Sequence, residues 1–448
     1  MISVSGVRGI VGTDLTPEFV ARWAAAFGTL ARDRRDGSVV LGRDARTSGP
    51  MLADAARAGL LSVGVRVVDC DLVPTPTAQL AVEHHHAGGG IILTASHNPV
   101  EWNAMKFVGP DGLFLDADAA AALRAAAEGD VPRAAWNGVG TVERDGEAVA
   151  RHLEAALALP QVDVKAIRAR RFRVALDCVR GAGGTIMPAL LEALGCTVHA
   201  IHTETDGHFP RSPEPVPEQL GELGALVRSV GAEVGMAVDP DVDRLALVDE
   251  AGRAIGEDYT LAFAVDTVLR KTRGPVVVNL STSLVVDDAA RAHGVKTRRV
   301  PVGEANVARA MRAAGAVIGG EGNGGVILPG LHFGRDAPLA AALVLDLLAS
   351  GRESVSTRVA ARPQYTIVKA KAPRAADLKQ VYEGLVAQFS DAALDRQDGL
   401  RLAWPDRWLH VRPSGTEPIV RLIAEGPDRD VAQGLVAAAR GVLERNAA

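Results

Sequence analysis

The sequence predicts an α/β fold, with three related α/β domains that contain mixed sheets and a smaller C-terminal α+β domain, arranged around a central cleft. Two observations predict this architecture. A unit of strand, turn, amphipathic helix and glycine-led second strand can be read three times along the 448 residues. After about residue 360 that pattern stops. Because a domain typically has about 150 residues, a chain of this length can also contain several domains.

Each copy of the repeated unit is followed by a strand and a polar loop. The three copies span residues 39–68, 174–198 and 276–297. After each copy a further strand enters a loop, and these loops contain Ser96, the aspartates between 239 and 243, and Glu321. Because open α/β sheets bind ligands at the carboxyl ends of their strands, we expect the three loops to face one shared cleft.

The rest of the chain predicts a different domain. It shows a strand at 365–368, a helix near 378–389, strands around 408–412 and a closing helix at 431–443. We therefore expect four domains, over residues 1–150, 151–252, 253–360 and 361–448. The first three contain the repeated unit, and the fourth is the α+β domain.

Composition and charge exclude several classes of function. The net charge is −5 and no long basic run occurs, so we expect no binding to nucleic acid or to anionic membranes. The three cysteines, Cys70, Cys178 and Cys196, have no CxxC spacing, which favours reduced thiols in the cytoplasm. No signal peptide is apparent, and the most apolar helix candidate, at 338–349, is too short to span a bilayer. We expect a soluble, cytoplasmic protein.

Three alternating aspartates, Asp239, Asp241 and Asp243, form a candidate metal site. On an extended loop their carboxylates can turn toward one centre and offer the hard oxygen ligands that Mg²⁺ or Ca²⁺ accepts. Each pair of carboxylates repels by about 1 kcal/mol at 4 Å in water, and by more where water is excluded. A bound dication relieves this repulsion.

An EF-hand is the alternative interpretation of the same aspartates. Together with Glu250 they occupy the first, third, fifth and twelfth places of such a loop. Two features disfavour it. Arg244 stands where that loop requires glycine, and the flanks at 234–238 and 245–248 read as buried strands rather than helices.

Ser96 is the candidate nucleophile. It follows a short apolar strand at 91–93, so it leaves the sheet at a carboxyl end, where ligands bind in open α/β folds. The alternative is that Ser96 is a helix N-cap or an ordinary loop residue, which is the common role of a serine before a polar turn and a proline.

Together these segments resemble the α-D-phosphohexomutase family, which includes phosphoglucomutase, phosphomannomutase and phosphoglucosamine mutase. Thr94-Ala95-Ser96-His97-Asn98-Pro99 is similar to the phosphoserine loop of that family, and the segment 239–244 is similar to its metal loop. Other family-like segments lie at 5–9, 42–46, 206–210, 213–215, 320–325 and 412–418. The resemblance therefore covers nearly the whole chain.

The resemblance implies an isomerase that interconverts hexose or hexosamine 1-phosphate and 6-phosphate through a phosphoserine enzyme and a bisphosphate intermediate. Ser96 would carry the phosphoryl group, and Mg²⁺ would bind to Ser96, Asp239, Asp241 and Asp243. Arg244 would balance the remaining charge. The other implied catalytic residues are Lys106 as general base, its partner Arg8, and His97. A lysine needs burial or cationic neighbours to act as a base near neutral pH.

The resemblance also implies the residues that bind the substrate. Glu321 and Asn323 would bind the sugar hydroxyls. The phosphate that does not react would be held by Arg412, Ser414, Gly415, Thr416 and Arg421. Outside this set, Arg43 and Arg46 either add to the positive field of the site or pair with Asp44.

The sugar loop departs from the family. Many members have a histidine shortly after the glutamate, whereas this chain reads Gly-Asn-Gly-Gly at 322–325. His332 is a candidate to fill the space, although a lone histidine is more often structural. The loop form resembles that of archaeal-type phosphoglucosamine mutases, which favours glucosamine phosphate as the substrate. Phosphomannomutase or phosphoglucomutase activity is the alternative.

Two other classes of protein fit parts of the pattern. A haloacid-dehalogenase-type phosphatase also has aspartates after a strand, and it would carry the phosphoryl group on Asp239. A non-enzymatic sugar-phosphate binding protein would bind hexose phosphate without converting it. For all these classes we expect a monomer or a homodimer.

Overall fold

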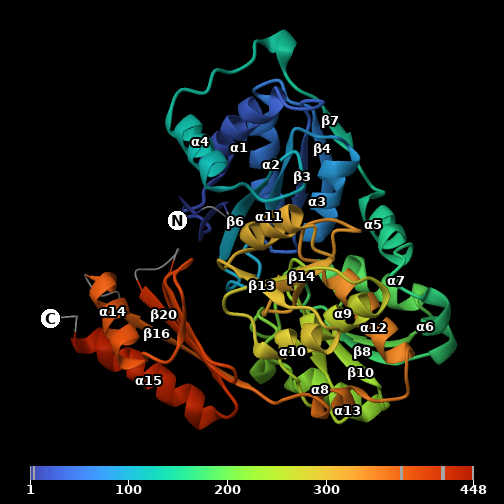
Figure 1. The fold of residues 1–448 in the computed structure, drawn as a ribbon. Coiled ribbons are helices and arrows are strands. Elements are labelled where there is room, and N and C mark those ends of the chain that lie inside the picture. The colour runs from blue at the N-terminus through green and yellow to red at the C-terminus, as the bar shows by residue number, and fades with distance from the viewer. Residues whose placement is uncertain (1, 4–5, 374–376, 415–418, 446–448) are drawn as a thin grey trace.

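The computed structural model describes residues 2–3, 6–373, 377–414 and 419–445 and shows four domains, each built on its own sheet (Figure 1). Domain I lies at the top of Figure 1, domains II and III lie below it, and domain IV projects at the lower left. One sheet falls within each of the four predicted residue ranges. The domain boundaries themselves remain predictions.

Domain I contains a seven-stranded sheet with helices on both faces. Its strands, in spatial order, are β1 (Ile2–Ser3), β2 (Gly6–Ile10), β6 (Trp102–Val108), β5 (Gly89–Leu93), β3 (Val39–Arg43), β4 (Val67–Leu72) and β7 (Val142–Arg144). Helices α1 (Pro17–Arg32), α2 (Gly49–Leu61) and α4 (Ala117–Glu128) pack with Val39 and Leu41 on one face, whereas α3 (Thr75–His84) packs with Val40 on the other. Successive strand residues point to opposite faces, so an unbroken apolar run is buried on both.

Domains II and III repeat the central part of this sheet. In domain II the order is β9 (Thr197–Ile201), β8 (Arg173–Asp177), β10 (Val234–Val238) and β11 (Leu245–Val248). In domain III it is β13 (Thr297–Val300), β12 (Val276–Asn279), β14 (Ile318–Glu321) and β15 (Gly325–Ile327). In each domain only the last strand is antiparallel, as in β4-β3-β5-β6 of domain I. The predicted threefold repeat is therefore confirmed.

The helices of domains II and III are α5 (Ala148–Leu157), α6 (Val164–Arg170), α7 (Met187–Ala193), α8 (Gly221–Val230), α9 (Asp258–Lys271), α10 (Leu284–Ala292), α11 (Glu304–Ala314), α12 (Ala337–Ala349) and α13 (Val355–Ala360). Residues of α6, α7, α9, α10, α12 and α13 form one hydrophobic core that spans both domains, and α5 packs against it, whereas α8 and α11 pack in two smaller clusters. Helix α12 is the apolar segment noted in the sequence, and it is buried along nearly its whole length because it packs between the two domains. No helix in the described residues has both the length and the hydrophobicity needed to cross a membrane.

Domain IV has a different architecture. Its sheet is antiparallel, in the order β16 (Thr366–Pro373), β20 (Ile419–Gly426), β19 (Trp408–Pro413), β18 (Leu400–Ala403) and β17 (Ala393–Asp395). Helices α14 (Leu378–Gln388) and α15 (Arg429–Arg445) pack with this sheet in a core made only of domain IV residues. The predicted α+β domain is confirmed.

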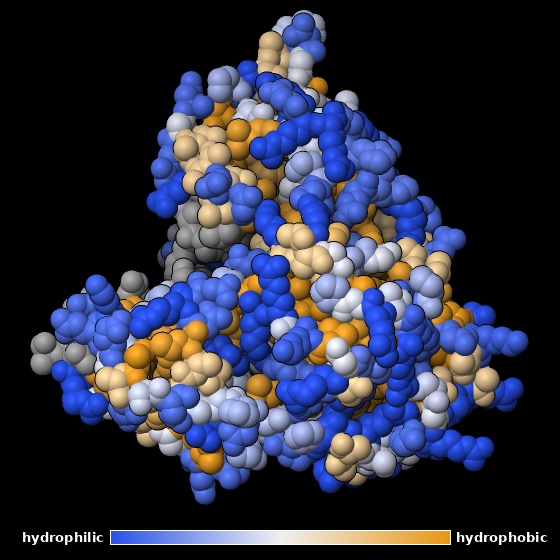
Figure 2. All heavy atoms as spheres, in the orientation of Figure 1, coloured by the Kyte–Doolittle hydropathy of each residue, from blue (hydrophilic) through white to orange (hydrophobic). Residues whose placement is uncertain are grey.

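The equivalent topology places three loops at equivalent positions. The loop with Ser96 joins β5 to β6, the aspartate loop joins β10 to β11, and the loop that begins at Glu321 joins β14 to β15. On the face of the molecule shown in Figure 2, hydrophilic residues cover most of the surface and apolar residues form separate patches.

Candidate active site

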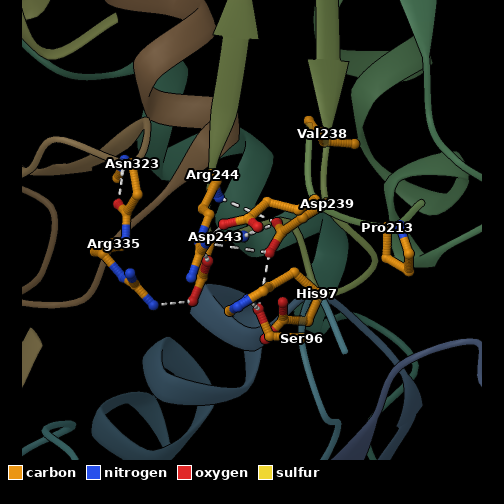
Figure 3. Close-up of polar contacts among 12 residues, drawn as sticks. Ser96, His97, Pro213, Val238, Asp239, Asp243, Arg244, Asn323 and Arg335 are labelled. Atoms are coloured by element: carbon orange, nitrogen blue, oxygen red, sulfur yellow. Dashed lines mark hydrogen bonds and ion pairs between the residues drawn. The ribbon is translucent and has the colours of Figure 1, made fainter. Parts of the chain in front are cut away.

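The loops of domains I and II meet at a buried hydrogen bond. The Ser96 hydroxyl Oγ donates to Asp239 Oδ2 at 2.9 Å (Figure 3). Only 3% of Ser96 is exposed, and Asp239 is fully buried. Ser96 and Asp239 are 143 positions apart in the chain, and they are in direct contact in the structure. The sequence interpretation depends mainly on these two residues.

The backbone of Ser96 is left-handed, with φ at +49°. A non-glycine residue pays about 1–3 kcal/mol for such a conformation, which persists only where the surroundings enforce it. The Ser96 amide N–H donates to Thr94 Oγ1 at 2.9 Å. This turn aims the hydroxyl away from the sheet and toward the aspartate loop.

His97 lies beside the hydroxyl as a neutral ring. Its Nδ1 is 3.3 Å from Ser96 Oγ. Burial, together with the nearby cations Arg244 and Arg8, holds the pKa of His97 well below its usual value. At neutral pH the imidazole can therefore form a hydrogen bond with Ser96 without adding positive charge.

The aspartate loop has the properties of a cation site. Carboxylate oxygens of Asp239, Asp241 and Asp243 all lie within 4.8 Å of one another, and all three residues are buried. Within the described part of the chain, Asp241 Oδ1 and Asp243 Oδ1 accept no hydrogen bond. A buried carboxylate oxygen without a partner is costly, and hard oxygen ligands suit Mg²⁺ or Ca²⁺. The residues present therefore fit a divalent cation.

The structure around the aspartate loop does not match an EF-hand. The loop joins antiparallel strands, in which Val238 pairs with Leu245, instead of two helices. Glu250, which would be the twelfth ligand, bonds to Ser356. The strand flanks predicted from the sequence are confirmed.

Charge in the buried network is unbalanced. Five buried carboxylates, those of Asp239, Asp241, Asp243, Glu304 and Glu321, contact three basic side chains, those of Lys106, Arg244 and Arg335. If all are ionised, the network carries a formal charge of −2, which one dication would neutralise.

The pKa values of the aspartates reflect this imbalance. Burial, together with the negative charges of Asp243 and Asp241, raises the pKa of Asp239 well above its usual value. Burial also acts to raise the pKa of Asp241, but the ammonium of Lys106 outweighs it and lowers that pKa. A raised pKa at Asp239 is the effect expected of neighbouring carboxylates that are buried together.

Lys106 and Arg8 lie on neighbouring strands and face the loops. Arg8 on β2 pairs with Ala104 on β6, so its side chain emerges on the same face as that of Lys106. Arg8 Nη1 donates to Asn98 Oδ1 at 2.7 Å, and Lys106 Nζ donates to Asp241 Oδ2 at 2.7 Å. Arg8 thus holds the serine loop, whereas Lys106 lies against the aspartate loop.

Glu321 of domain III is held by three donors. It accepts from Asn279 Nδ2 at 2.9 Å, from the Gly303 amide at 2.9 Å and from Arg335 Nη1 at 2.8 Å. Burial acts against ionisation, but Arg335 and the other donors lower its pKa overall. Asn323 closes the turn, because its Oδ1 accepts from the Gly325 amide at 3.2 Å.

Arg335 is a site residue that the sequence interpretation missed. Its Nη2 donates to Asp243 at 2.5 Å (Figure 3). Its Nε donates to Glu304 at 3.0 Å, in addition to the bond with Glu321. The side chain therefore ties the aspartate loop to the loop that begins at Glu321. A single arginine has no local pattern that distinguishes it, so only the fold reveals this role.

His332 does not take the place suggested for it. It is buried, and its Nε2 lies 2.9 Å from Asp336 Oδ2, which also contacts His152 at 2.8 Å. This network joins α5 to the start of α12. The neighbouring residue Arg335, and not His332, reaches Glu321.

Domain IV brings two arginines toward domain III. Arg412 and Arg421 lie opposite each other on β19 and β20. Arg412 Nε is 2.8 Å from Asp398 Oδ2, and the same oxygen accepts from the Val302 amide at 3.2 Å. The Ser414 amide donates to the Ile419 carbonyl at 2.9 Å. The predicted residues Gly415 and Thr416 lie outside the described part of the chain.

Family patterns match all four domains. The alpha/beta/alpha domain I of the phosphoglucomutase/phosphomannomutase family matches residues 2–132, and domain II of that family matches residues 150–252. Its domain III matches residues 256–365, and its C-terminal domain matches residues 367–442. The four matches follow the order of the four sheets.

Individual proteins are similar over almost the full length. A phosphoglucomutase/phosphomannomutase of Thermococcus kodakarensis is 39% identical over 435 residues, which cover 96% of this chain and 95% of that protein. A probable phosphoglucosamine mutase of Methanopyrus kandleri is 36% identical, with 96% of this chain and 95% of that protein covered. The crystal structure of a phosphoglucomutase/phosphomannomutase family protein from Burkholderia thailandensis has a TM-score of 0.86 at 26% identity, covering 99% of this chain and 97% of that chain.

The charge imbalance predicts a stability that depends on metal and pH. The raised pKa of Asp239 means that the metal-free folded protein binds a proton which the unfolded chain releases above about pH 4. Metal-free stability should therefore fall as pH rises from about 4 through that raised pKa. The lowered pKa of Asp241 affects stability only at lower pH. Mg²⁺ at about 100 times its Kd adds about 2.7 kcal/mol, and its stabilising effect should grow with pH.

Thermal unfolding with Mg²⁺ or EDTA between pH 5 and 8 measures this effect. Asp241→Asn should lose most of the Mg²⁺-dependent shift, whereas Asp118→Asn on the exposed surface of α4 should keep it. A wild-type midpoint that Mg²⁺ leaves unchanged at pH 8 would rule out a cation site in this loop.

Proposed function

Because this chain belongs to the phosphoglucomutase/phosphomannomutase family of phosphohexomutases, we propose that it interconverts the 1-phosphate and 6-phosphate of a hexosamine through phosphorylated Ser96 and a bisphosphate intermediate. The observation that supports this most directly is the contact between Ser96 Oγ and Asp239 Oδ2 at 2.9 Å. It joins a nucleophile to a carboxylate cluster. Phosphoryl transfer needs this combination, because its catalysis consists mainly of positioning and charge stabilisation.

Each half-reaction breaks one phosphorus–oxygen bond and forms another. The bond between phosphorus and Ser96 Oγ breaks, and a bond to a sugar hydroxyl oxygen forms, which gives the bisphosphate. The sugar hydroxyl gives its proton to a base. Ser96 Oγ leaves phosphorus with the bonding pair of electrons and takes up the proton that the base passes on, so that one proton moves from the sugar to Ser96. After the bisphosphate has turned around, the reverse transfer from its other end restores phosphoserine.

Lys106 is the base in this proposal. Its Nζ now donates to Asp241, so the ammonium has to lose a proton and turn from that carboxylate before a lone pair can face a hydroxyl. Arg8 on the adjacent strand supplies a second positive charge near the same place. His97, which is neutral because its pKa is lowered, places its Nδ1 within hydrogen-bonding distance of Ser96 Oγ.

The proposed cofactor is Mg²⁺, held by Asp239, Asp241, Asp243 and the phosphorylated Ser96. When bound, it would neutralise negative charge on the transferring phosphoryl group. Arg244 supports the same loop, because its guanidinium lies 3.6 Å from Asp243 and 3.9 Å from Asp239. A contact with Glu214 at 3.0 Å fixes the direction of that side chain.

Substrate recognition is assigned to domains III and IV. Glu321 would accept hydrogen bonds from the sugar hydroxyls, and Asn323 shapes the loop around it. Arg412, Ser414, Gly415, Thr416 and Arg421 would bind the phosphate that does not react, because guanidinium groups bind phosphate in a bidentate manner. Closure of domain IV on the substrate would exclude water and so limit hydrolysis.

The preferred sugar is proposed to be glucosamine phosphate. The Gly-Asn-Gly-Gly form of the sugar loop and the similarity to the Methanopyrus kandleri protein support this choice. The similarity to the Thermococcus kodakarensis protein supports the alternative, phosphomannomutase or phosphoglucomutase activity.

We expect Ser96→Ala to lose turnover by at least about 10³-fold while the fold is kept, because in this proposal Ser96 is the group that carries the phosphoryl. Ser229→Ala, at an exposed position on α8, is the matched control. Mass spectrometry of wild-type protein incubated with a hexose bisphosphate should find one phosphoryl group on Ser96. A phosphoryl group on Asp239 that is lost in mild base would instead indicate the dehalogenase-type phosphatase chemistry.

Lys106→Met should lower kcat by about 10²- to 10⁴-fold, the usual contribution of a general base, with a small change in KM. Steady-state kinetics as a function of pH measures this, and the variant should also lose one limb of the wild-type profile. Lys379→Met on the exposed face of α14 is the control. A variant at position 106 with near wild-type kcat would contradict the assignment.

Parallel assays of glucosamine, mannose, glucose and N-acetylglucosamine phosphates, with Mg²⁺ and a bisphosphate activator, test the substrate. We expect kcat/KM to be highest for glucosamine phosphate by at least about tenfold, a difference of about 1.4 kcal/mol in transition-state binding. A higher value for mannose or glucose phosphate would favour the alternative activity. No conversion of any of the four would favour a sugar-phosphate binding protein.

A further inference from the structure

Arg46 lies beneath the serine loop and is completely buried. Its guanidinium donates to four backbone carbonyls of that loop. Nη2 bonds to Ser96 O at 2.7 Å and to Asn98 O at 2.6 Å, and Nη1 bonds to Pro99 O at 2.7 Å and to Trp102 O at 2.8 Å. A planar fork of this kind holds several acceptors in fixed directions, which a lysine ammonium cannot do.

The same short segment also holds the amide side of Ser96. Asp44 Oδ1 accepts from the Arg46 amide at 3.0 Å, and Asp44 Oδ2 accepts from Thr94 Oγ1 at 2.6 Å. Thr94 Oγ1 in turn accepts from the Ser96 amide at 2.9 Å. Both the N–H and the C=O of the left-handed Ser96 are thus tied to residues 44–46.

Domain II packs against residues 44–46. The ring of Phe209 lies 5.1 Å from the Arg46 guanidinium carbon. At Gly207 an added Cβ would come within 2.3 Å of the Ala45 carbonyl oxygen, so the two backbones are in close contact. Because domain II also carries Asp239, residues 44–46 link the support of Ser96 to the domain that accepts its hydrogen bond.

We propose that Arg46 is a positioning residue for phosphoryl transfer. It fixes the serine loop in the conformation that places Ser96 Oγ against Asp239, and it touches no reacting atom itself. This inference rests on the proposed function, because it requires Ser96 to be the group that is phosphorylated. The sequence left open whether Arg46 adds to the anion field or pairs with Asp44. Its four bonds to the loop give it a third role.

Arg46→Lys tests the proposal, because it keeps the charge beside Asp44 and removes the fork. We expect kcat and the rate of phosphoryl loading of Ser96 from a hexose bisphosphate to fall together by at least thirtyfold. KM for the sugar phosphate should stay within threefold, because its binding residues lie in domains III and IV. Mg²⁺ affinity of the unphosphorylated protein, measured by calorimetry, should stay within fivefold, because the three aspartates lie in domain II.

Arg57→Lys is the matched control. Arg57 lies in the same domain on α2, but it pairs with Asp69 at 2.6 Å and with Asp54 instead of with the serine loop. We expect wild-type kcat from this variant. If Arg46→Lys does not fold, Thr94→Val removes the other tie to Ser96 and leaves Arg46 paired with Asp44, and it should show the same selective loss of kcat.

The possible outcomes separate the two proposals. Wild-type kcat and loading rate in Arg46→Lys, or in Thr94→Val where that variant is the one measured, would overturn the positioning role. A lowered melting temperature with unchanged kcat per folded molecule would show a purely structural residue and would also overturn it. If wild-type protein takes up no phosphoryl group at Ser96, the proposed function fails, whatever the Arg46 variant does.

Discussion

The buried excess of negative charge in the aspartate loop is the constraint on which the arrangement of the first three domains depends. Each of them supplies one cation to it: Lys106 from domain I, Arg244 from domain II and Arg335 from domain III. Removing one partner of a buried ion pair typically costs about 3–5 kcal/mol, because the other charge is left uncompensated. Charge compensation therefore works together with packing to hold the three domains in a single relative placement.

The threefold repeat explains how such distant groups come together. In each of the three domains the junction between the third and the fourth strand of the repeated unit falls at the same edge of the sheet. One junction contributes a serine, one a set of carboxylates and one a glutamate. Similar frameworks thus present different chemistry from equivalent positions, and the combined site needs all three.

Sequence and structure agree where the information is local. Ser96 and the alternating aspartates sit in short motifs after recognisable strands, and the strand and helix pattern repeats at regular distances, so both could be predicted. Arg335 and Glu304 could not, because their roles come from contacts across domain interfaces that leave no trace in neighbouring residues. The sequence left the role of His332 open between the site and the structure for the same reason: the partner that fixes its position, Asp336, also binds His152 from a distant helix.

Domain IV differs from the others in how it is attached. Its hydrophobic core contains only its own residues, and it meets domain III through polar contacts such as Ser281 with His410 and the Leu284 amide with Glu425. Polar contacts of this kind can be exchanged for water with little change in free energy, whereas the core shared by domains II and III cannot. Domain IV can therefore separate from domain III at a lower cost in free energy than domains II and III can separate from each other. In the proposed reaction, this difference would give the bisphosphate room to turn while Ser96 and the aspartate loop keep their relative placement.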